Sequence, residues 1–300
     1  MNKLFTKKFL YTFLLNINSF DSEERLIVKI VVFKLYCASV ELRKILLEII
    51  EEFILDFNSN REYQITGLVE CFDILSKQLF IRCKIILLES IYSGLNKPIN
   101  KKYLYILERT ILQTFKNKNL KSFWNNYKTF LISLIKEDNS VLLIVVNFLY
   151  KSWPARNPEK ICLTIELYEN LVNSYQSELV KLPFFKKLTS KIITSIKDLN
   201  IIVSDKAMIM FKNDNLMKVC FADFKLGPKI ITNLIDNIKN HWYDEIKAIS
   251  KLVLAKIKNN YPSEVETLDQ ELRDYVKTIQ FSQEQHDELW EMMRFELKAD

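Results

Sequence analysis

Two clusters of polar side chains in this sequence have the residue types that bind metals or transfer protons. His241 is followed by Asp244 and Glu245 at positions i+3 and i+4, so on a helix the three side chains share one face. A metal site built on one helix needs a further ligand from a neighbouring helix, and the sequence offers no identifiable one. We therefore expect no metal site, and a packed or capping His241.

The second cluster is a set of carboxylates that crowd one predicted helix: Glu48, Glu51 and Glu52. Paired carboxylates can share acid–base catalysis, but acidic clusters on the back of a helix are usually solvated. Glycine-rich nucleotide-binding loops and nucleophile elbows are absent, and three glycines in the whole chain are too few to build a phosphate-binding loop. The sequence therefore predicts a protein without catalytic residues and without a cofactor.

A basic stretch over residues 116–128 is the best candidate for nucleic-acid binding. Its lysines would contact phosphates, and Phe115, Trp124 and Tyr127 would stack on bases. The same three aromatic residues fit the spacing of a buried helix face, and that interpretation is favoured. We therefore do not expect nucleic acid as a partner.

The elements that carry these groups are predicted to be helices throughout. Three Gly and six Pro among 300 residues are too few for the tight turns of sheets, barrels and sandwiches, whereas 49% hydrophobic residues suffice for a core. Apolar residues recur with helical spacing over 42–54, after a potential N-cap at Ser39, and again over 230–238, after Pro228. The predicted fold class is all-α.

Short breaks recur along the chain at intervals of about 20 or about 40 residues, as in an array of antiparallel helix pairs of the HEAT-like kind. The stretch 158–227 shows no clear break, so the pairs there follow from length alone. No long linker interrupts the pattern, and we predict one HEAT-like solenoid domain over residues 1–300. Its segment 261–300 is acidic, with eleven Asp or Glu against four Lys or Arg.

Five scattered cysteines form no CxxC pair, which predicts reduced thiols and an intracellular protein, cytoplasmic or nuclear. Residues 7–15 combine two lysines with an apolar run, as a signal peptide does, but no small-residue cleavage site follows, so an opening helix is favoured. The apolar run over 141–150 falls far short of the about 20 residues that a bilayer requires. We expect no membrane partner.

Four landmarks in the second half resemble the B-prime regulatory subunits of protein phosphatase 2A. Residues 151–160, around Trp153-Pro154, are similar to the family's Tyr-Trp-Pro-Lys-x-x-x-Pro-Lys-Glu stretch. Residues 205–214 resemble its Ala-Glu-Arg-Ala-Leu and Trp-Asn-Asn-Glu segments, and residues 240–246 resemble its Thr-His-Trp-Asn-Lys-Thr-Ile. An acidic segment ending in Trp290 follows in the same order.

The first half of the chain resembles the family more loosely. Residues 20–25 are similar to its Ser-Glu-Asp-Pro-Arg-Glu-Arg turn, and residues 35–43 to its Ile-Tyr-Gly-Lys-Phe-Leu-Gly-Leu-Arg. The family's extreme N-terminal portion has no counterpart, so the resemblance implies a divergent, shortened member. It also implies a curved HEAT-like solenoid without an active site, which binds the scaffold and catalytic subunits of the phosphatase and selects its substrates.

Substrate selection in this family works through a groove between repeats that binds Leu-x-x-Ile-x-Glu motifs. By resemblance, Tyr36 would form an aromatic wall of the groove, and Lys34 and Arg43 would supply cations for the motif's Glu. Leu75 and Lys84 would belong to the next helix pair. Three positions depart from the family pattern: Phe33, Phe80 and Cys83. Tyr36 as core, with Lys34 and Arg43 as solvated helix ends, is the alternative interpretation.

The resemblance places further residues in loops that would contact the phosphatase subunits: Arg156, Asn157, Asn213, Asn240 and His241. Trp153 and Pro154 are expected to mark the end of a helix beside a packed indole, and Trp242 is expected in the core. An unrelated HEAT-like scaffold or transport adaptor remains the alternative function. An acidic inner groove would favour the adaptor, and a groove lined by Lys34, Arg43 and Lys84 would favour the phosphatase subunit.

Overall fold

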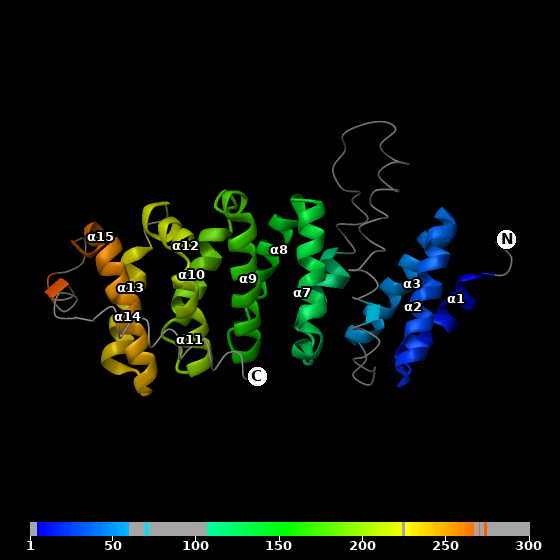
Figure 1. Cartoon of the computed structure of the whole chain (residues 1–300), viewed down its shortest axis with the longest axis horizontal. Helices are drawn as coiled ribbons and strands as arrows, with labels where there is room; N and C mark the ends of the chain where they lie inside the picture. The colour runs from blue at the N-terminus through cyan, green and yellow to red at the C-terminus, as the bar shows by residue number, and fades with distance from the viewer. Residues whose placement is uncertain are drawn as a thin grey trace. The chain divides into compact units, whose positions relative to one another are not determined.

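The computed structural model describes residues 5–59, 70–71, 107–223, 226–266, 270 and 273–274. All regular elements in these ranges are helical (Figure 1). The chain divides into two compact units, Met1–Phe148 and Leu149–Asp300. The helix pairs within each unit are those of a helical-repeat protein, which confirms the predicted all-α class. One continuous domain over residues 1–300 stays a prediction.

The first unit opens with three helices, α1 (Lys7–Leu14), α2 (Ser22–Ala38) and α3 (Val40–Ser59), with a single turn, η1 (Leu15–Asn18), after α1. Ser39 precedes α3 as predicted, and its Oγ accepts a hydrogen bond of 3.2 Å from the Glu41 amide. The predicted apolar face of α3 is buried at Leu42, Leu46, Ile49, Ile50, Phe53 and Ile54.

The predicted glutamate cluster on α3 faces another helix rather than a catalytic site. Lys7 of α1 lies 2.6 Å from Glu52 and 3.6 Å from Glu48. The hydrogen bond with Glu52, followed by the charges of both carboxylates, raises the pKa of Lys7 above its ordinary value. These ion pairs are exposed, so their contribution to stability is small.

The first unit continues with η3 (Leu107–Ile111), η4 (Leu112–Lys116), α7 (Leu120–Glu137) and α8 (Ser140–Lys151), whose last turn belongs to the second unit. Phe115, Trp124 and Tyr127 are only 2%, 4% and 0% exposed. Rings buried to this degree have no face open to a base, so the prediction that they belong to the core is confirmed. The interpretation of 116–128 as a stacking surface for nucleic acid is wrong.

The second unit contains α9 (Pro158–Leu179), α10 (Phe185–Ser195), α11 (Ile201–Ile209), α12 (Asp214–Lys218), α13 (Gly227–Asn240), α14 (Asp244–Asn260) and α15 (Pro262–Glu266). Short turns η5 (Met210–Lys212) and η6 (Val219–Asp223) flank α12. Pro228 lies in the first turn of α13, as predicted. The stretch without a clear break in sequence is in fact divided at residues 180–184 and 196–200.

The helices of the second unit form two layers. One contains α10 and α13, which contact each other, and the other contains α9, α11 and α14. Within a repeat, α13 and α14 lie side by side and are joined by a three-residue connection (Figure 1). This arrangement places the connections of consecutive repeats next to one another, and the candidate site lies on two of these connections.

The described cysteines are free thiols at Cys71, Cys162 and Cys220. Burial raises the pKa of Cys71 and of Cys220 to about 12, and that of Cys162 to about 11. A neutral thiol is a poor nucleophile, and the buried side chains of Cys71 and Cys220 are packed in the core. None of the described helices combines the length and apolar character needed to cross a bilayer.

Candidate interaction surface on the repeat connections

The connections between paired helices in the second unit recur at a fixed interval. Asn157, Asn200 and Tyr243 are the N-caps of α9, α11 and α14, and successive caps are 43 residues apart. The Oδ1 atoms of Asn157 and Asn200 accept hydrogen bonds from the amides of Lys160 (3.0 Å) and Val203 (3.3 Å). These caps satisfy amides at the helix starts and fix where each connection ends.

Trp242 is held outward on the α13–α14 connection. Its indole Nε1 donates a hydrogen bond of 3.0 Å to the carbonyl of Leu199 on the preceding connection. The ring stacks on His241 with centroids 5.9 Å apart and 19° between planes, yet the residue is 62% exposed. Leu199 and Ile202 are also exposed, at 74% and 69%. We call Leu199, Ile202 and Trp242 the loop patch.

His241 anchors this connection from within. It is 4% exposed, and its Nδ1 accepts a hydrogen bond of 3.1 Å from the Tyr243 amide. Its Nε2 lies 3.3 Å from the carbonyl of Asp198, which can only accept. The neutral tautomer protonated on Nε2 satisfies both contacts. Both ring nitrogens are therefore engaged, which confirms that His241 is a packed, capping residue. No group of three potential metal ligands is present among the described residues.

Two buried asparagines of α13, like Trp242, donate side-chain hydrogen bonds to main-chain carbonyls of the preceding repeat. Asn233 Nδ2 donates to the carbonyl of Ile193, and Asn237 Nδ2 to that of Ile196, each over 2.7 Å. Asn237 Nδ2 also lies 3.4 Å and 3.3 Å from the hydroxyls of Ser204 and Ser250. Ile193 and Ile196 are at the C-terminal end of α10, where the Ile193 carbonyl also accepts from the Ile196 amide and the Ile196 carbonyl also accepts from the Ser204 hydroxyl. The position of α13 against α10 is thus fixed by directional bonds.

Charged groups of both signs lie near the loop patch. Lys247 Nζ is 2.9 Å from Asp244 Oδ1, and the hydrogen bond between them lowers the pKa of Asp244 below its ordinary value. Lys197 Nζ lies 3.9 Å from Asp236, which also accepts a hydrogen bond from Asn240. An apolar centre with a mixed polar rim is the composition of a protein–protein contact, because the centre is desolvated while the rim stays wet.

The residues predicted to contact phosphatase subunits fall in three places. Asn240 and His241 directly precede Trp242, and exposed Arg156 and Asn157 belong to the α8–α9 connection. Asn213 is separate, because it caps α12 and bonds Asn173 of α9. Of these five residues, only Asn240 and His241 adjoin the loop patch.

The prediction that Trp242 lies in the core is wrong. Its N–H group reaches the carbonyl of Leu199, and the ring stays on the outside of the connection. The exposed Leu199 and Ile202 were not predicted either. Two large apolar residues around Asp198 and Asn200, both turn formers, are the sequence signal for them. The predicted helix end before Trp153 is confirmed, because α8 ends at Lys151.

Two of the predicted groove residues have described side chains in the first unit. Lys34 is exposed on α2, whereas Tyr36 is 2% exposed and packs in the core. Arg43 lies on α3, but its side chain is outside what the structure describes, as are Leu75 and Lys84 altogether. The groove itself therefore stays a prediction.

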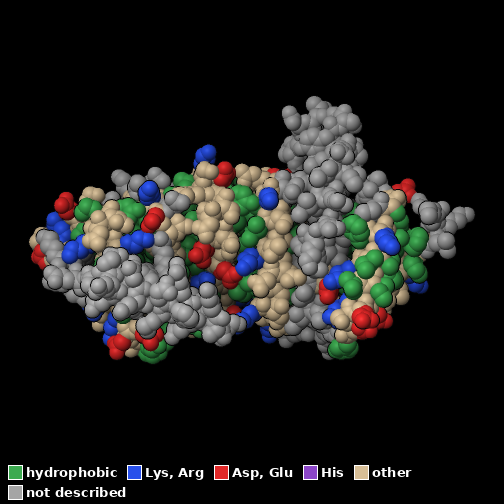
Figure 2. All heavy atoms as spheres, in the orientation of Figure 1, with side chains coloured by type: hydrophobic (Ala, Val, Ile, Leu, Met, Phe, Trp, Pro, Cys, Tyr) green, Lys and Arg blue, Asp and Glu red, His purple; other side chains and the backbone are tan. Residues whose placement is uncertain are grey.

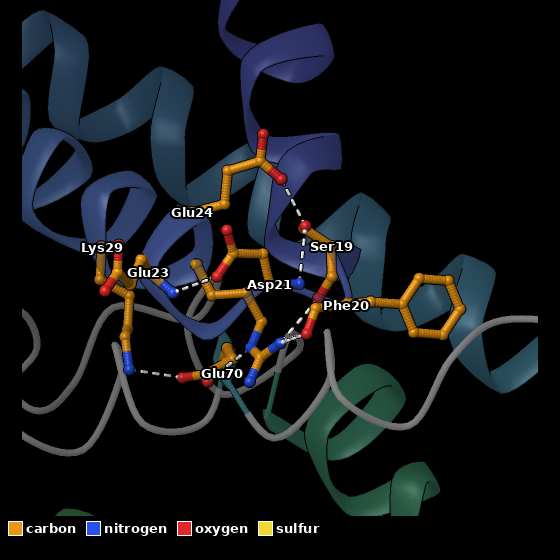
Figure 3. A network of polar contacts seen from close by, with 8 residues as sticks. Ser19, Phe20, Asp21, Glu23, Glu24, Lys29 and Glu70 are labelled. Atoms are coloured by element: carbon orange, nitrogen blue, oxygen red, sulfur yellow. Dashed lines mark hydrogen bonds and ion pairs between the residues drawn. The ribbon is translucent and has the colours of Figure 1, made fainter.

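The α1–α2 connection of the first unit also presents an aromatic side chain (Figure 3). Arg25 Nη1 donates to the carbonyls of Ser19 (2.7 Å) and Phe20 (3.0 Å), and its Nε lies 3.2 Å from Glu70 Oε1. Lys29 Nζ lies 2.6 Å from the other Glu70 oxygen. The network fixes the backbone while Phe20 stays 89% exposed.

Exposed apolar side chains continue along α2 at Leu26, Ile27 and Ile30. Figure 2 shows such side chains gathered over the N-terminal helices, with charged residues among them. Single exposed apolar residues are common on protein surfaces, but a group of them on one helix is typical of a surface that contacts another protein.

The sequence as a whole matches a known family. The family model for the protein phosphatase 2A regulatory B subunit (B56 family) matches residues 1–296. The 56 kDa regulatory subunit delta 1 isoform of Schizosaccharomyces pombe is 26% identical over 275 residues, covering 90% of this chain and 46% of that protein. The B' delta isoform of Arabidopsis thaliana is 20% identical over 302 residues, covering 96% and 58%.

The human 56 kDa regulatory subunit alpha isoform is 22% identical over 255 residues, covering 84% of this chain and 49% of the human protein. The chain thus spans about half the length of the curated relatives it matches. The match over almost every residue agrees with the resemblance seen in the landmarks around Trp153 and Trp242. The chain belongs to the B56 family of protein phosphatase 2A regulatory subunits.

Proposed function

We propose that this protein is a non-catalytic regulatory subunit of protein phosphatase 2A, which binds the scaffold and catalytic subunits and directs them to substrates. The observation that carries the proposal is the family match over residues 1–296. The relatives are named as regulatory subunits of this phosphatase, and this chain covers 46% and 58% of the lengths of two of them. The helical-repeat fold, with exposed groups on its connections, agrees with a protein that works by binding.

The loop patch is the surface we assign to the phosphatase subunits. Trp242 offers a large ring whose orientation is already fixed by the bond to Leu199 and by the stack on His241. A rigid aromatic side chain loses little conformational entropy on binding, and such residues supply much of the energy of protein interfaces. His241 holds the connection in place, and exposed Asn240 lies beside it at the end of α13.

Co-purification tests this function directly. The tagged full chain, expressed in cells of its own source, should retain the phosphatase scaffold and catalytic subunits through washing. Recovery of neither subunit, with the helical circular dichroism spectrum intact, would refute the regulatory role.

We further propose that substrates carrying a Leu-x-x-Ile-x-Glu motif bind in the first unit, with Lys34 as a cation for the motif's Glu and with Arg43, Leu75 and Lys84 completing the groove. The exposed position of Lys34 on α2 supports its part in this proposal. The buried ring of Tyr36 would support the groove from below rather than contact the peptide.

Reversing the charge at Lys34 should weaken binding of a fluorescent Leu-x-x-Ile-x-Glu peptide. Lys34→Glu replaces an attraction for the motif's Glu by a repulsion, so the Kd measured by fluorescence anisotropy should rise by about 10-fold or more. Lys44→Glu, an equal charge change at an exposed position of α3, is the matched control and should leave the Kd unchanged. Equal Kd values for Lys34→Glu and the wild type would remove Lys34 from the site.

A further inference from the structure

Lysines and aromatic rings are interleaved where the last turn of α8 meets the start of α10. Tyr150 and Phe184 stack with centroids 5.7 Å apart and 27° between planes. Lys191 Nζ lies 4.5 Å from the Tyr150 centroid and 5.9 Å from that of Trp153. Lys187 Nζ lies 5.8 Å from both Tyr150 and Phe184. We call these five residues the lysine–aromatic surface; all of them belong to the second unit.

The lysines of this surface have no acidic partner among the described residues. Helix α10 contains no acidic residue, and neither Lys187 nor Lys191 forms an ion pair with any described residue. Lys191 Nζ donates one hydrogen bond, of 2.8 Å, to the Tyr150 carbonyl, which leaves two N–H groups for other acceptors. Partial burial lowers the pKa of Lys191, because the charged form is poorly solvated there. A carboxylate placed beside it would relieve that cost.

A third lysine extends the charge along the same layer. Lys229 of α13 is exposed, and its Nζ donates to the Ser190 hydroxyl over 2.7 Å and lies 3.3 Å from the Ser190 carbonyl. Ser190 is one residue before Lys191 on α10, so Lys229 continues the row of cations from one helix to the next. A row of cations beside apolar rings suits a chain that alternates acidic and apolar side chains.

The stacking of these rings favours a peptide over a nucleic acid as the ligand of this surface. Tyr150 is already engaged by Phe184 and by both lysines, so its faces are not open for a base to stack on. Single-stranded nucleic acid depends on such stacking together with many phosphate contacts. A peptide needs only apolar edges for its side chains and cations for its carboxylates.

We propose that the lysine–aromatic surface, continued by Lys229, is a docking site for an acidic peptide segment of a partner protein. Its Asp or Glu side chains pair with Lys187, Lys191 and Lys229, and its apolar side chains cover the edges of the stacked rings. This site shares no residue with the loop patch or with the groove proposed in the first unit. It gives the second unit a recognition role of its own.

Fluorescence anisotropy of the full chain with two labelled peptides tests this proposal. The acidic probe repeats Glu-Asp-Phe-Glu-Glu-Leu, and the neutral probe has Gln and Asn in place of Glu and Asp. The acidic probe should bind at least about 10-fold more tightly, and its binding should weaken as salt is added. The double variant Lys187→Glu, Lys229→Glu should abolish this preference, whereas the double variant Lys8→Glu, Lys218→Glu, with the same change of net charge at exposed positions of α1 and α12, should preserve it. Lys191 is left unchanged because its bond to Tyr150 supports the fold.

Three results would overturn the proposal. Equal binding of the acidic and neutral probes would show that charge plays no part. An equal loss of affinity in the two double variants would show that only net charge matters. Tighter binding of single-stranded oligouridine than of the acidic peptide, with the same dependence on Lys187 and Lys229, would assign the surface to nucleic acid instead.

Discussion

Replacing Trp242 by alanine should weaken binding to the phosphatase scaffold and catalytic subunits by about 30-fold or more, equivalent to about 2 kcal/mol. The substitution removes the one ring of the loop patch that is both largely exposed and fixed in orientation. The fold should lose only about 1 kcal/mol, the contribution of one hydrogen bond. Isothermal titration with the purified subunits measures the first quantity, and urea unfolding measures the second.

Phe9→Ala is a suitable control for this experiment. Phe9 is an aromatic residue of similar exposure, at 51%, but it lies on α1 rather than on a repeat connection of the second unit. Its substitution should leave the affinity unchanged. If Trp242→Ala bound as tightly as the wild type, the loop patch would not be the phosphatase-binding surface.

Replacing Asn237 by alanine should destabilise the second unit by about 2–3 kcal/mol. The amide is buried and donates to the Ile196 carbonyl, with the hydroxyls of Ser204 and Ser250 also in reach. Alanine removes the amide donor, leaves the Ile196 carbonyl with the Ser204 hydroxyl alone, and opens a small cavity between α13 and α10. Urea unfolding followed by circular dichroism at the helical band gives the free energy of unfolding.

Asn240→Ala, three residues further along α13, provides the comparison. Asn240 is exposed and bonds the Asp236 side chain, so its loss should change the free energy of unfolding by less than about 0.5 kcal/mol. Equal effects of the two substitutions would mean that the buried bonds at Asn237 do not hold the repeats together.

Much of the helical framework could be predicted from sequence, because it rests on local chemistry. The buried face of α3 follows directly from its apolar spacing, and its start from the hydroxyl of Ser39. The division between α10 and α11 was not visible because Asp198-Leu199-Asn200 turns the chain without Gly or Pro. Asn200 caps α11 there, which is a weaker signal than a glycine.

The candidate site was only half predictable, and the two neighbours His241 and Trp242 show why. Resemblance pointed to this connection, and the capping of His241 agreed with the expected chemistry of a lone histidine. Whether Trp242 faces inward or outward depends on a carbonyl 43 residues earlier in the chain. The residues around Trp242 give no sign of that contact, so the spacing of the neighbouring apolar residues predicted a buried indole.

The hydrogen bonds that the side chains of Asn233, Asn237 and Trp242 donate to the preceding repeat have one chemical trait in common: their acceptors are main-chain carbonyls, at Ile193, Ile196 and Leu199. A main-chain carbonyl is present whatever side chain stands at that position. The earlier repeat can therefore exchange surface residues over time without losing its neighbour, while each later repeat must keep its own donors. At each such contact, substitutions are therefore tolerated at the acceptor positions of the earlier repeat more readily than at the donor positions of the later one.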